Sequence, residues 1–335
     1  MIPVGSNDRT DGFTLVLGAG GRVGMASHAG VLRALDEVGG LDPARARLVI
    51  GTSAGSVMGA LLRLGWSTSE IWALATRTRL PDHRDDVAGD DLFGRSWTNP
   101  SQLVRRALGS VFVVSRSLVR VPLVPIPELA RRVFPGGFLS LSEEQGDVGT
   151  GIGDHWPDAP LWLCAVDIET GRRVVLGRRG DQPPLAEAVL ASCAIPGYYQ
   201  PVRLDGRTLV DGGVHSTTNL DLAGRVEAPL VIASAPMAYD PRRAPGPLAR
   251  AARRPINRGL ARDRMALRSA GRSVLLLRPG REELDAHGLN PMRGHGLEPV
   301  AVAAYDATAR FIASPRAARL LTEAAEAPIS VASAS

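Results

Sequence analysis

Cysteine and long hydrophobic runs are scarce in this chain of 335 residues. Its two cysteines, Cys164 and Cys193, both lie in apolar segments, which argues against a disulfide framework and indicates small buried side chains in a reducing compartment. No run reaches the roughly 18 consecutive apolar residues of a membrane span, and the first residues lack the basic start and apolar stretch of a secretory leader. These absences predict a cytoplasmic protein.

Lysine is absent, so all 39 basic residues are arginine; with 34 acidic residues the formal net charge is +5. Ten of the arginines, with a single aspartate, gather in residues 242–272. That segment is either a solvated helix face or a surface for anionic head groups, which keeps peripheral contact with an anionic membrane open. Aromatic residues make up only 4% of the chain and none interleaves with these arginines. We therefore expect no nucleic-acid partner.

Short runs rich in Val, Ile and Leu alternate with helical patterns along the chain, which predicts an α/β fold around a largely parallel, buried central sheet. The expected strands are FTLVLG, ARLVIG, LWLCAVDI, RRVVLG, TLVDGG, PLVIASA and SVLLLR. We expect a single domain over residues 13–323, with flexible termini at 1–12 and 324–335. Residues 81–158, rich in Pro, Gly and Arg, break the alternation and are expected to form a lid insertion.

The stretch TLVLGAGGRVGMASHAGVL, residues 14–32, passes from an apolar run through clustered glycines into a helical pattern. Such a turn presents backbone N–H groups to an anion at a helix N-terminus. The anion is either the pyrophosphate of a dinucleotide or an oxyanion formed during acyl transfer. A dinucleotide site needs a carboxylate about 20 residues later, at the end of the next strand. That strand ends at Ser53 instead, which disfavours an NAD(P)-binding oxidoreductase.

Residues 51–55, GTSAG, fit the G-x-S-x-G pattern directly between an expected strand and an expected helix. In that context the serine sits on a sharp, strained turn with its hydroxyl presented, and the glycines avoid collisions with the neighbouring strand and helix. The helix dipole favours negative charge at the serine. Ser53 is therefore the candidate nucleophile, and the alternative is a serine in an ordinary tight turn.

The candidate base is Asp211, which ends the expected strand TLV and is followed by two glycines that let the backbone turn away. An ordinary turn aspartate is the alternative. A Ser-His-Asp triad would need a downstream histidine, and His215, His287 and His295 are available. We expect all three in solvated loops, and His28 packed inside the first helix.

Taken in order, the glycine-rich turn, GTSAG, DIETGRRVVLG, ASCAIPGYYQPV and VDGG resemble the patatin-like phospholipase family over about residues 14–236. The resemblance implies a three-layer fold with helices on both faces of the sheet and a catalytic dyad of Ser53 and Asp211 without histidine. It places the oxyanion loop at residues 19–24, although Ala19 replaces a glycine and Val23 a basic residue. Its backbone donors would be Gly20, Gly21 and Arg22, and the glycines supporting the motifs are Gly18, Gly24, Gly51, Gly55, Gly212 and Gly213.

The activity implied is phospholipase A-like hydrolysis of carboxylic esters of lipids, with no metal or organic cofactor. The apolar segment 111–126 would line an acyl tunnel, touch a bilayer or pack as a lid. Two alternatives stay open: an esterase with a Ser-His-Asp triad, and a non-catalytic binding protein of the same fold. The sequence does not indicate the oligomeric state.

Overall fold

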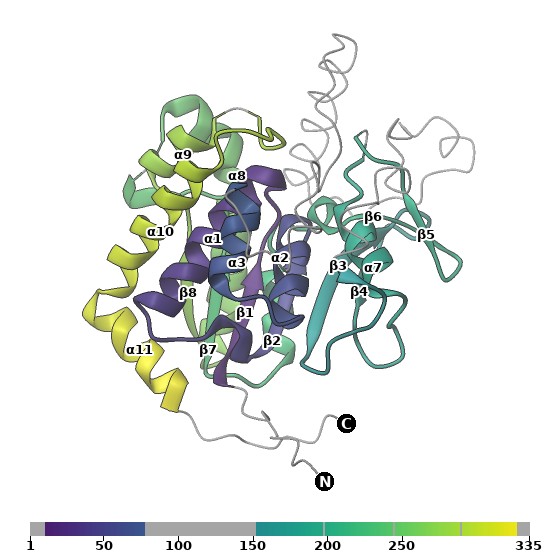
Figure 1. Cartoon of the computed structure of the whole chain (residues 1–335), viewed down its shortest axis with the longest axis horizontal. Coiled ribbons are helices and arrows are strands. Elements are labelled where there is room, and N and C mark those ends of the chain that lie inside the picture. Colours follow the sequence, from purple (N-terminus) through teal and green to yellow (C-terminus); the bar gives the residue numbers. More distant parts are fainter. Residues whose placement is uncertain (1–10, 78–151, 197, 244, 289, 327–335) are drawn as a thin grey trace.

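The computed structural model describes residues 11–77, 152–196, 198–243, 245–288 and 290–326. Their strands form one eight-stranded sheet in the order β5-β6-β3-β2-β1-β7-β8, with β4 paired to β3 outside this path (Figure 1). The strands are β1 (Asp11–Leu17), β2 (Ala46–Thr52), β3 (Leu161–Asp167), β4 (Arg173–Leu176), β5 (Val202–Leu204), β6 (Arg207–Asp211), β7 (Leu230–Ser234) and β8 (Ser273–Leu277).

The five strands β3, β2, β1, β7 and β8 run parallel, whereas β4, β5 and β6 pair antiparallel. All seven predicted strands are present, and the mixed α/β architecture is confirmed. The parallel strands read as continuous apolar runs because both faces of the sheet are covered. In β1, for example, Leu15 and Leu17 pack into one core and Val16 into the other.

One face of the sheet carries most of the helices, and their apolar sides join β1, β2, β7 and β8 in the larger core. The helices with residues in this core are α1 (Gly21–Glu37), α2 (Ala54–Arg63), α3 (Thr68–Thr76), α7 (Leu185–Cys193), α10 (Glu298–Ile312) and α11 (Pro315–Glu326). The short helix α9 (Arg281–His287) adjoins α10. Figure 1 shows α1, α2 and α3 together in front of the strands.

The opposite face is covered by α8 (Pro247–Ser269), which buries Ile256, Leu260 and Leu267 in the second core. Most of the arginines of the basic segment 242–272 fall on this helix, and several of them are exposed. The expected helix preceding the strand SVLLLR is therefore present, and its exposed arginines are compatible with a solvated face and with a surface for anionic head groups. Helices on both faces of the sheet make the three layers that the sequence predicts.

The expected domain limits and insertion differ slightly from the described elements. Residues 78–151 lie outside the described part, and with them most of the expected lid at 81–158, including segment 111–126. Residues 152–158 belong to the α/β body, because Ile152 is buried in the larger core and Asp154 O accepts a hydrogen bond of 3.0 Å from Leu185 N. At the C-terminal side, α11 continues to Glu326 because Ala324 is buried against the core.

Candidate active site

The strand β3 brings the two candidate catalytic residues together. One of its edges is shared: Thr52 of β2 lies opposite Cys164, and Asp211 of β6 lies opposite the next residue, Ala165. The other edge pairs with β4 along this stretch. The end of β2 and the end of β6 therefore meet head to head, which brings Ser53, the residue after Thr52, close enough to Asp211 for its side chain to lower the pKa of that carboxyl.

Ser53 has a backbone conformation that side-chain-bearing residues rarely adopt, with φ 53° and ψ −121°. Its N–H donates a hydrogen bond of 3.0 Å to Ser192 Oγ, and its carbonyl accepts bonds from Ser56 N at 2.7 Å and from Ser56 Oγ at 2.6 Å. Conformations of this kind cost about 1–3 kcal/mol and persist where the surroundings hold them. The strained turn expected of a nucleophile elbow is therefore present, and it begins α2.

The glycines around Ser53 and Asp211 are required by close approach of backbone. A Cβ on Gly55 would collide with the carbonyl of Leu17, and one on Gly51 would lie 2.6 Å from Ser56 Cα. A Cβ on Gly212 would collide with the carbonyl of Cys164. Larger residues at these positions would push the elbow away from β1 or β6 away from β3.

Asp211 is buried, with an exposed fraction of 3%. Burial raises the pKa of its carboxyl from 3.8 to about 6, and the hydrogen bonds from the Ser53 side chain and the Gly213 N–H oppose that rise. The bond from Gly213 N to Asp211 Oδ1 measures 2.7 Å. A carboxylate with a pKa near neutrality is a stronger proton acceptor than an exposed aspartate, while it remains mostly ionised at pH 7.

The glycine-rich turn leads from β1 into α1. The N–H groups of Gly18 and Ala19 are already used, by Ser234 O at 3.0 Å and Thr217 O at 2.7 Å. Within the described residues, the N–H groups of Gly20 and Gly21 have no hydrogen-bond acceptor. Gly21 also has φ +60°, a value that favours glycine. Two unused backbone donors at a helix start are available to bind an anion.

This turn lies beside both candidate catalytic residues. Gly24 faces Ala54, the residue after Ser53, and Gly213 faces Ala19. Gly24 itself is not sterically required, because a Cβ there would meet only ordinary contacts at 3.6 Å or more. The third predicted donor, Arg22, is the second residue of α1; its nearly buried guanidinium lies against Gly294.

Within the described residues, the Asp211 carboxylate accepts a hydrogen bond from Gly213 N, and its pKa is influenced by Ser53 and Gly213 rather than by a histidine. His215 and His295 are exposed, as expected. The expectation for His287 is wrong: it is buried at the end of α9, with Nε2 3.3 Å from Glu283 Oε1, because its helix packs that side inward.

His28 is packed inside α1, as the sequence predicts, and it supports the glycine-rich turn. Its Nδ1 lies 2.9 Å from Ser234 Oγ and its Nε2 2.7 Å from the carbonyl of Gly18. Burial lowers the pKa of His28 to about 4, so the ring is neutral at pH 7 and Nε2–H donates to Gly18 while Nδ1 accepts from Ser234.

Two supporting residues were not identified from the sequence. Ser192 accepts from Ser53 N and donates to the Cys164 carbonyl at 2.7 Å. Asn219 donates through Nδ2 to Thr52 Oγ1 at 3.0 Å, which holds the residue before the elbow. Ser192 lies in the segment ASCAIPG, which carries part of the family resemblance, so the sequence offered a reason to expect a role for it. No motif in the sequence pointed to Asn219.

Comparison with known proteins agrees with this architecture. Residues 15–223 match the family described as patatin-like phospholipase. The chain belongs to the patatin-like phospholipase family.

Among individual relatives, the chain is 31% identical over 216 residues to the uncharacterized protein YqhO of Bacillus subtilis, covering 59% of this chain and 62% of YqhO. It is 29% identical over 223 residues to human patatin-like phospholipase domain-containing protein 6, covering 66% of this chain and 13% of that protein. The matches therefore span less than two thirds of either relative. VipD from Legionella pneumophila, a solved structure, has a TM-score of 0.46 at 13% identity, with 91% of this chain and 67% of VipD covered.

Two further observations concern only the described residues. None of their helices has the length and apolar character needed to cross a membrane. Nor do they bring three or more His, Cys, Asp or Glu side chains together in a way that could hold a metal ion.

Proposed function

We propose that this protein is a serine acyl hydrolase that cleaves carboxylic esters of lipids with a dyad of Ser53 and Asp211. The observation that carries the proposal is that Ser53, on a strained strand-to-helix turn, meets the buried carboxyl of Asp211 where β2 and β6 end on one edge of β3, and that its side chain lowers the pKa of that carboxyl. A serine activated by an adjacent base is the arrangement that covalent acyl transfer requires.

In the first half of the reaction, Asp211 accepts the proton of Ser53 Oγ as Oγ attacks the carbonyl carbon of the ester. The oxygen of the tetrahedral intermediate becomes negative and is stabilised by backbone N–H groups of Gly20, Gly21 and Arg22. The intermediate collapses, the ester C–O bond breaks, and the departing alcohol takes the proton from Asp211. The acyl group stays on Ser53.

In the second half, Asp211 accepts a proton from water as the water oxygen attacks the acyl carbonyl. Collapse of this intermediate releases the carboxylic acid, and the proton on Asp211 returns to Ser53 Oγ. No step needs a metal or an organic cofactor, and histidine takes no part.

The thiol closest to this chemistry does not compete with Ser53. The Sγ of Cys193 lies 3.6 Å from Ser56 Oγ, and burial raises the pKa of this thiol to about 12. Because the thiolate is the nucleophilic form of cysteine, a thiol with this pKa is inert at pH 7. This supports serine as the acyl acceptor.

The proposed substrates are lipid esters, which a peripheral contact with anionic membrane would supply. Four exposed arginines of α8 follow one another at intervals of four residues, so they form a stripe on one side of the helix: Arg250, Arg254, Arg258 and Arg262. Such a stripe attracts anionic lipid head groups.

A fluorophosphonate probe tests the proposal, because it forms a covalent bond with an activated serine. We expect mass spectrometry to place the adduct on Ser53, and we expect Ser53→Ala to abolish hydrolysis of p-nitrophenyl esters. Ser269→Ala, at the end of α8, is the matched control and should keep wild-type turnover. An adduct on another serine, or turnover retained in Ser53→Ala, would reject the mechanism; an unlabelled, inactive protein would favour a binding role for the fold.

A further inference from the structure

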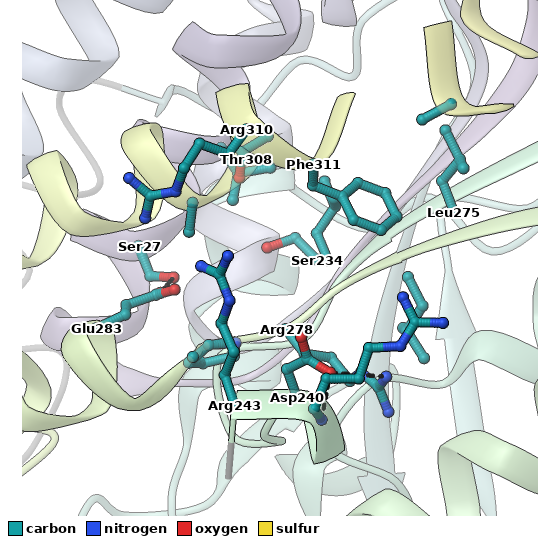
Figure 2. A pocket seen from close by; sticks show the side chains of 18 of the residues that line it. Ser27, Ser234, Asp240, Arg243, Leu275, Arg278, Glu283, Thr308, Arg310 and Phe311 are labelled. Carbon is teal, nitrogen blue, oxygen red and sulfur yellow. Dashed lines mark hydrogen bonds and ion pairs between the residues drawn. The ribbon is translucent and has the colours of Figure 1, made fainter. Parts of the chain in front are cut away.

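A cavity of about 550 Å³ lies at the edge of the sheet formed by β8, and neither Ser53 nor Asp211 lines it (Figure 2). Its walls come from β8, from α1, α10 and α11 on one face of the sheet, and from Arg264 of α8 on the other. The short 3-10 helix Pro241–Arg243 and the loop after β8 also line it. The volume is that of a typical small-molecule site.

The lining of this cavity is strongly basic. Six arginines face it, Arg242, Arg243, Arg264, Arg278, Arg310 and Arg316, against the two carboxylates of Asp240 and Glu283. Among the described residues, ion pairs reach two of the six: Arg278 lies 3.8 Å from Asp240, and Arg310 lies 3.5 Å from Glu282. In the part of the chain that the structure describes, the other four guanidinium groups make no ion pair or hydrogen bond.

The second carboxylate is already occupied. Glu283 is buried, and its Oε1 accepts a hydrogen bond of 2.7 Å from Ser27 Oγ and lies 3.3 Å from His287 Nε2. Figure 2 shows the guanidinium of Arg243 pointing toward Ser27 and Glu283 across the cavity. One carboxylate with partners of its own does not neutralise the arginines around it.

Arg278 shows the consequence of this crowding. Burial lowers the pKa of its guanidinium, Asp240 opposes that shift, and the neighbouring charges of Arg264 and Arg242 lower the pKa further. Its Nε is buried and has no hydrogen-bond partner within the described residues. An anion bound here would supply the missing acceptor and relieve the repulsion among the arginines.

Part of the cavity wall is apolar. Four residues of β8, from Val274 to Leu277, line it together with Phe311 of α10. The side chain of Phe311 is 40% exposed, which makes it one of the few large apolar side chains at the surface of the described residues. In Figure 2 the ring of Phe311 lies toward Leu275, whereas Arg278 and Asp240 lie together at another side of the cavity.

We propose that this cavity binds an amphipathic anion, a phosphate or carboxylate head group carried on an aliphatic chain. The head group would sit among Arg243, Arg264 and Arg278, and the chain would cover Phe311 and the side chains of β8. A small inorganic anion would leave the apolar wall exposed, and a neutral lipid would leave the arginines unpaired. The proposal does not depend on the catalytic role of Ser53.

Titration calorimetry on the Ser53→Ala protein tests the site without hydrolysis. The probe is octyl phosphate below its critical micelle concentration. We expect one saturable site whose affinity falls as salt is added, and at least tenfold weaker binding of either inorganic phosphate or 1-octanol. Octanoate, titrated in parallel, identifies the head group by its affinity relative to octyl phosphate.

Variants locate the binding site. Arg243→Gln combined with Arg264→Gln should weaken octyl phosphate binding at least tenfold, whereas Arg268→Gln, exposed on the same helix as Arg264 and outside the cavity, should leave it unchanged. Phe311→Ala should weaken binding of octyl phosphate but not of inorganic phosphate. Thermal melts confirm that each variant folds. Absence of saturable binding, equal affinity in the double variant, or 1-octanol binding as tightly as octyl phosphate would overturn the proposal.

Discussion

The backbone N–H of Ser53 donates a hydrogen bond of 3.0 Å to Oγ of Ser192, a residue 139 positions further along the chain. Ser192 Oγ in turn donates to the carbonyl of Cys164 on β3 at 2.7 Å. One hydroxyl therefore ties the strained elbow to β3, the strand that pairs with the Asp211 strand β6. The position of the proposed nucleophile therefore depends on a hydrogen bond to a residue distant in the sequence as well as on its own turn.

Replacing this hydroxyl should reduce both stability and activity. In Ser192→Ala the buried Ser53 N–H loses its acceptor, which should cost about 1–3 kcal/mol in the free energy of unfolding. We expect kcat for p-nitrophenyl esters to fall at least tenfold, because the elbow is no longer held. Urea unfolding and initial-rate kinetics measure the two effects. Wild-type kcat in a variant that is clearly destabilised would show that Ser192 serves folding alone.

Hydrolysis should lose activity on acidification through about pH 6. Burial raises the pKa of Asp211 to about 6, and only the ionised carboxylate accepts the proton of Ser53. The profile of kcat/KM against pH should therefore have an acidic limb with a midpoint near that value. A limb near pH 4, the ordinary range of an aspartate, would contradict the raised pKa of Asp211.

The same carboxyl makes stability depend on pH in the opposite direction. Its pKa is higher in the folded protein than the ordinary 3.8, so between about pH 4 and pH 6 the native state holds a proton that the unfolded chain releases. Stability therefore falls as the pH rises through this window, by up to about 3 kcal/mol from this group. Urea unfolding at pH 4, 5 and 6 should show the decline in wild type and a smaller one in Asp211→Asn.

A dyad and a triad predict different effects of histidine substitutions on turnover. We expect Asp211→Asn to lose essentially all turnover, because positioned proton transfer contributes roughly 10²–10⁴ in rate. His215→Ala and His295→Ala, both on exposed residues, should stay within about tenfold of wild type. His287→Asn, checked by circular dichroism because this residue is buried, should do the same. Complete inactivity of any one of them in a folded protein would replace the dyad with a triad.

The glycine-rich turn offers a matched pair of substitutions. A Cβ on Gly20 would lie 2.6 Å from Gly24 Cα, so Gly20→Ala must shift the proposed oxyanion donors. We expect kcat to fall by roughly 10²–10³, the usual effect of losing one such donor. Gly24→Ala, one turn later, meets only ordinary contacts and should keep activity within threefold. Similar losses in both variants would indicate that general disruption of α1 is responsible.

Membrane contact can be tested on the arginine stripe of α8. We expect the protein to co-sediment with vesicles containing phosphatidylserine at low salt and to be released at high salt, because screening weakens surface attraction. Replacing Arg254 and Arg258 with Gln should reduce this binding severalfold, and Arg319→Gln on α11 is the control. Equal binding to neutral and anionic vesicles would leave the stripe as a solvated helix face.

The strands could be predicted because their chemistry is local. A strand buried on both faces reads as a continuous run of Val, Ile and Leu, and each of the seven runs became a strand. The strand β5 was not predicted, because its three residues are too few to form a recognisable apolar run. The helix at His287 was mistaken for a loop because seven residues rich in Asp, Glu and His show no clear apolar period, and the packing against α10 decides it.

The sequence by itself determined the residue types of the proposed site: a serine between two glycines at the end of one strand, an aspartate before two glycines at the end of another, and clustered glycines before the first helix. Only the tertiary structure decided that Ser53 and Asp211 meet, because their contact depends on β2 and β6 sharing one edge of β3. The same holds for the raised pKa of Asp211 and for the arginine-lined cavity beside β8, since burial and the proximity of distant residues are properties of the folded chain.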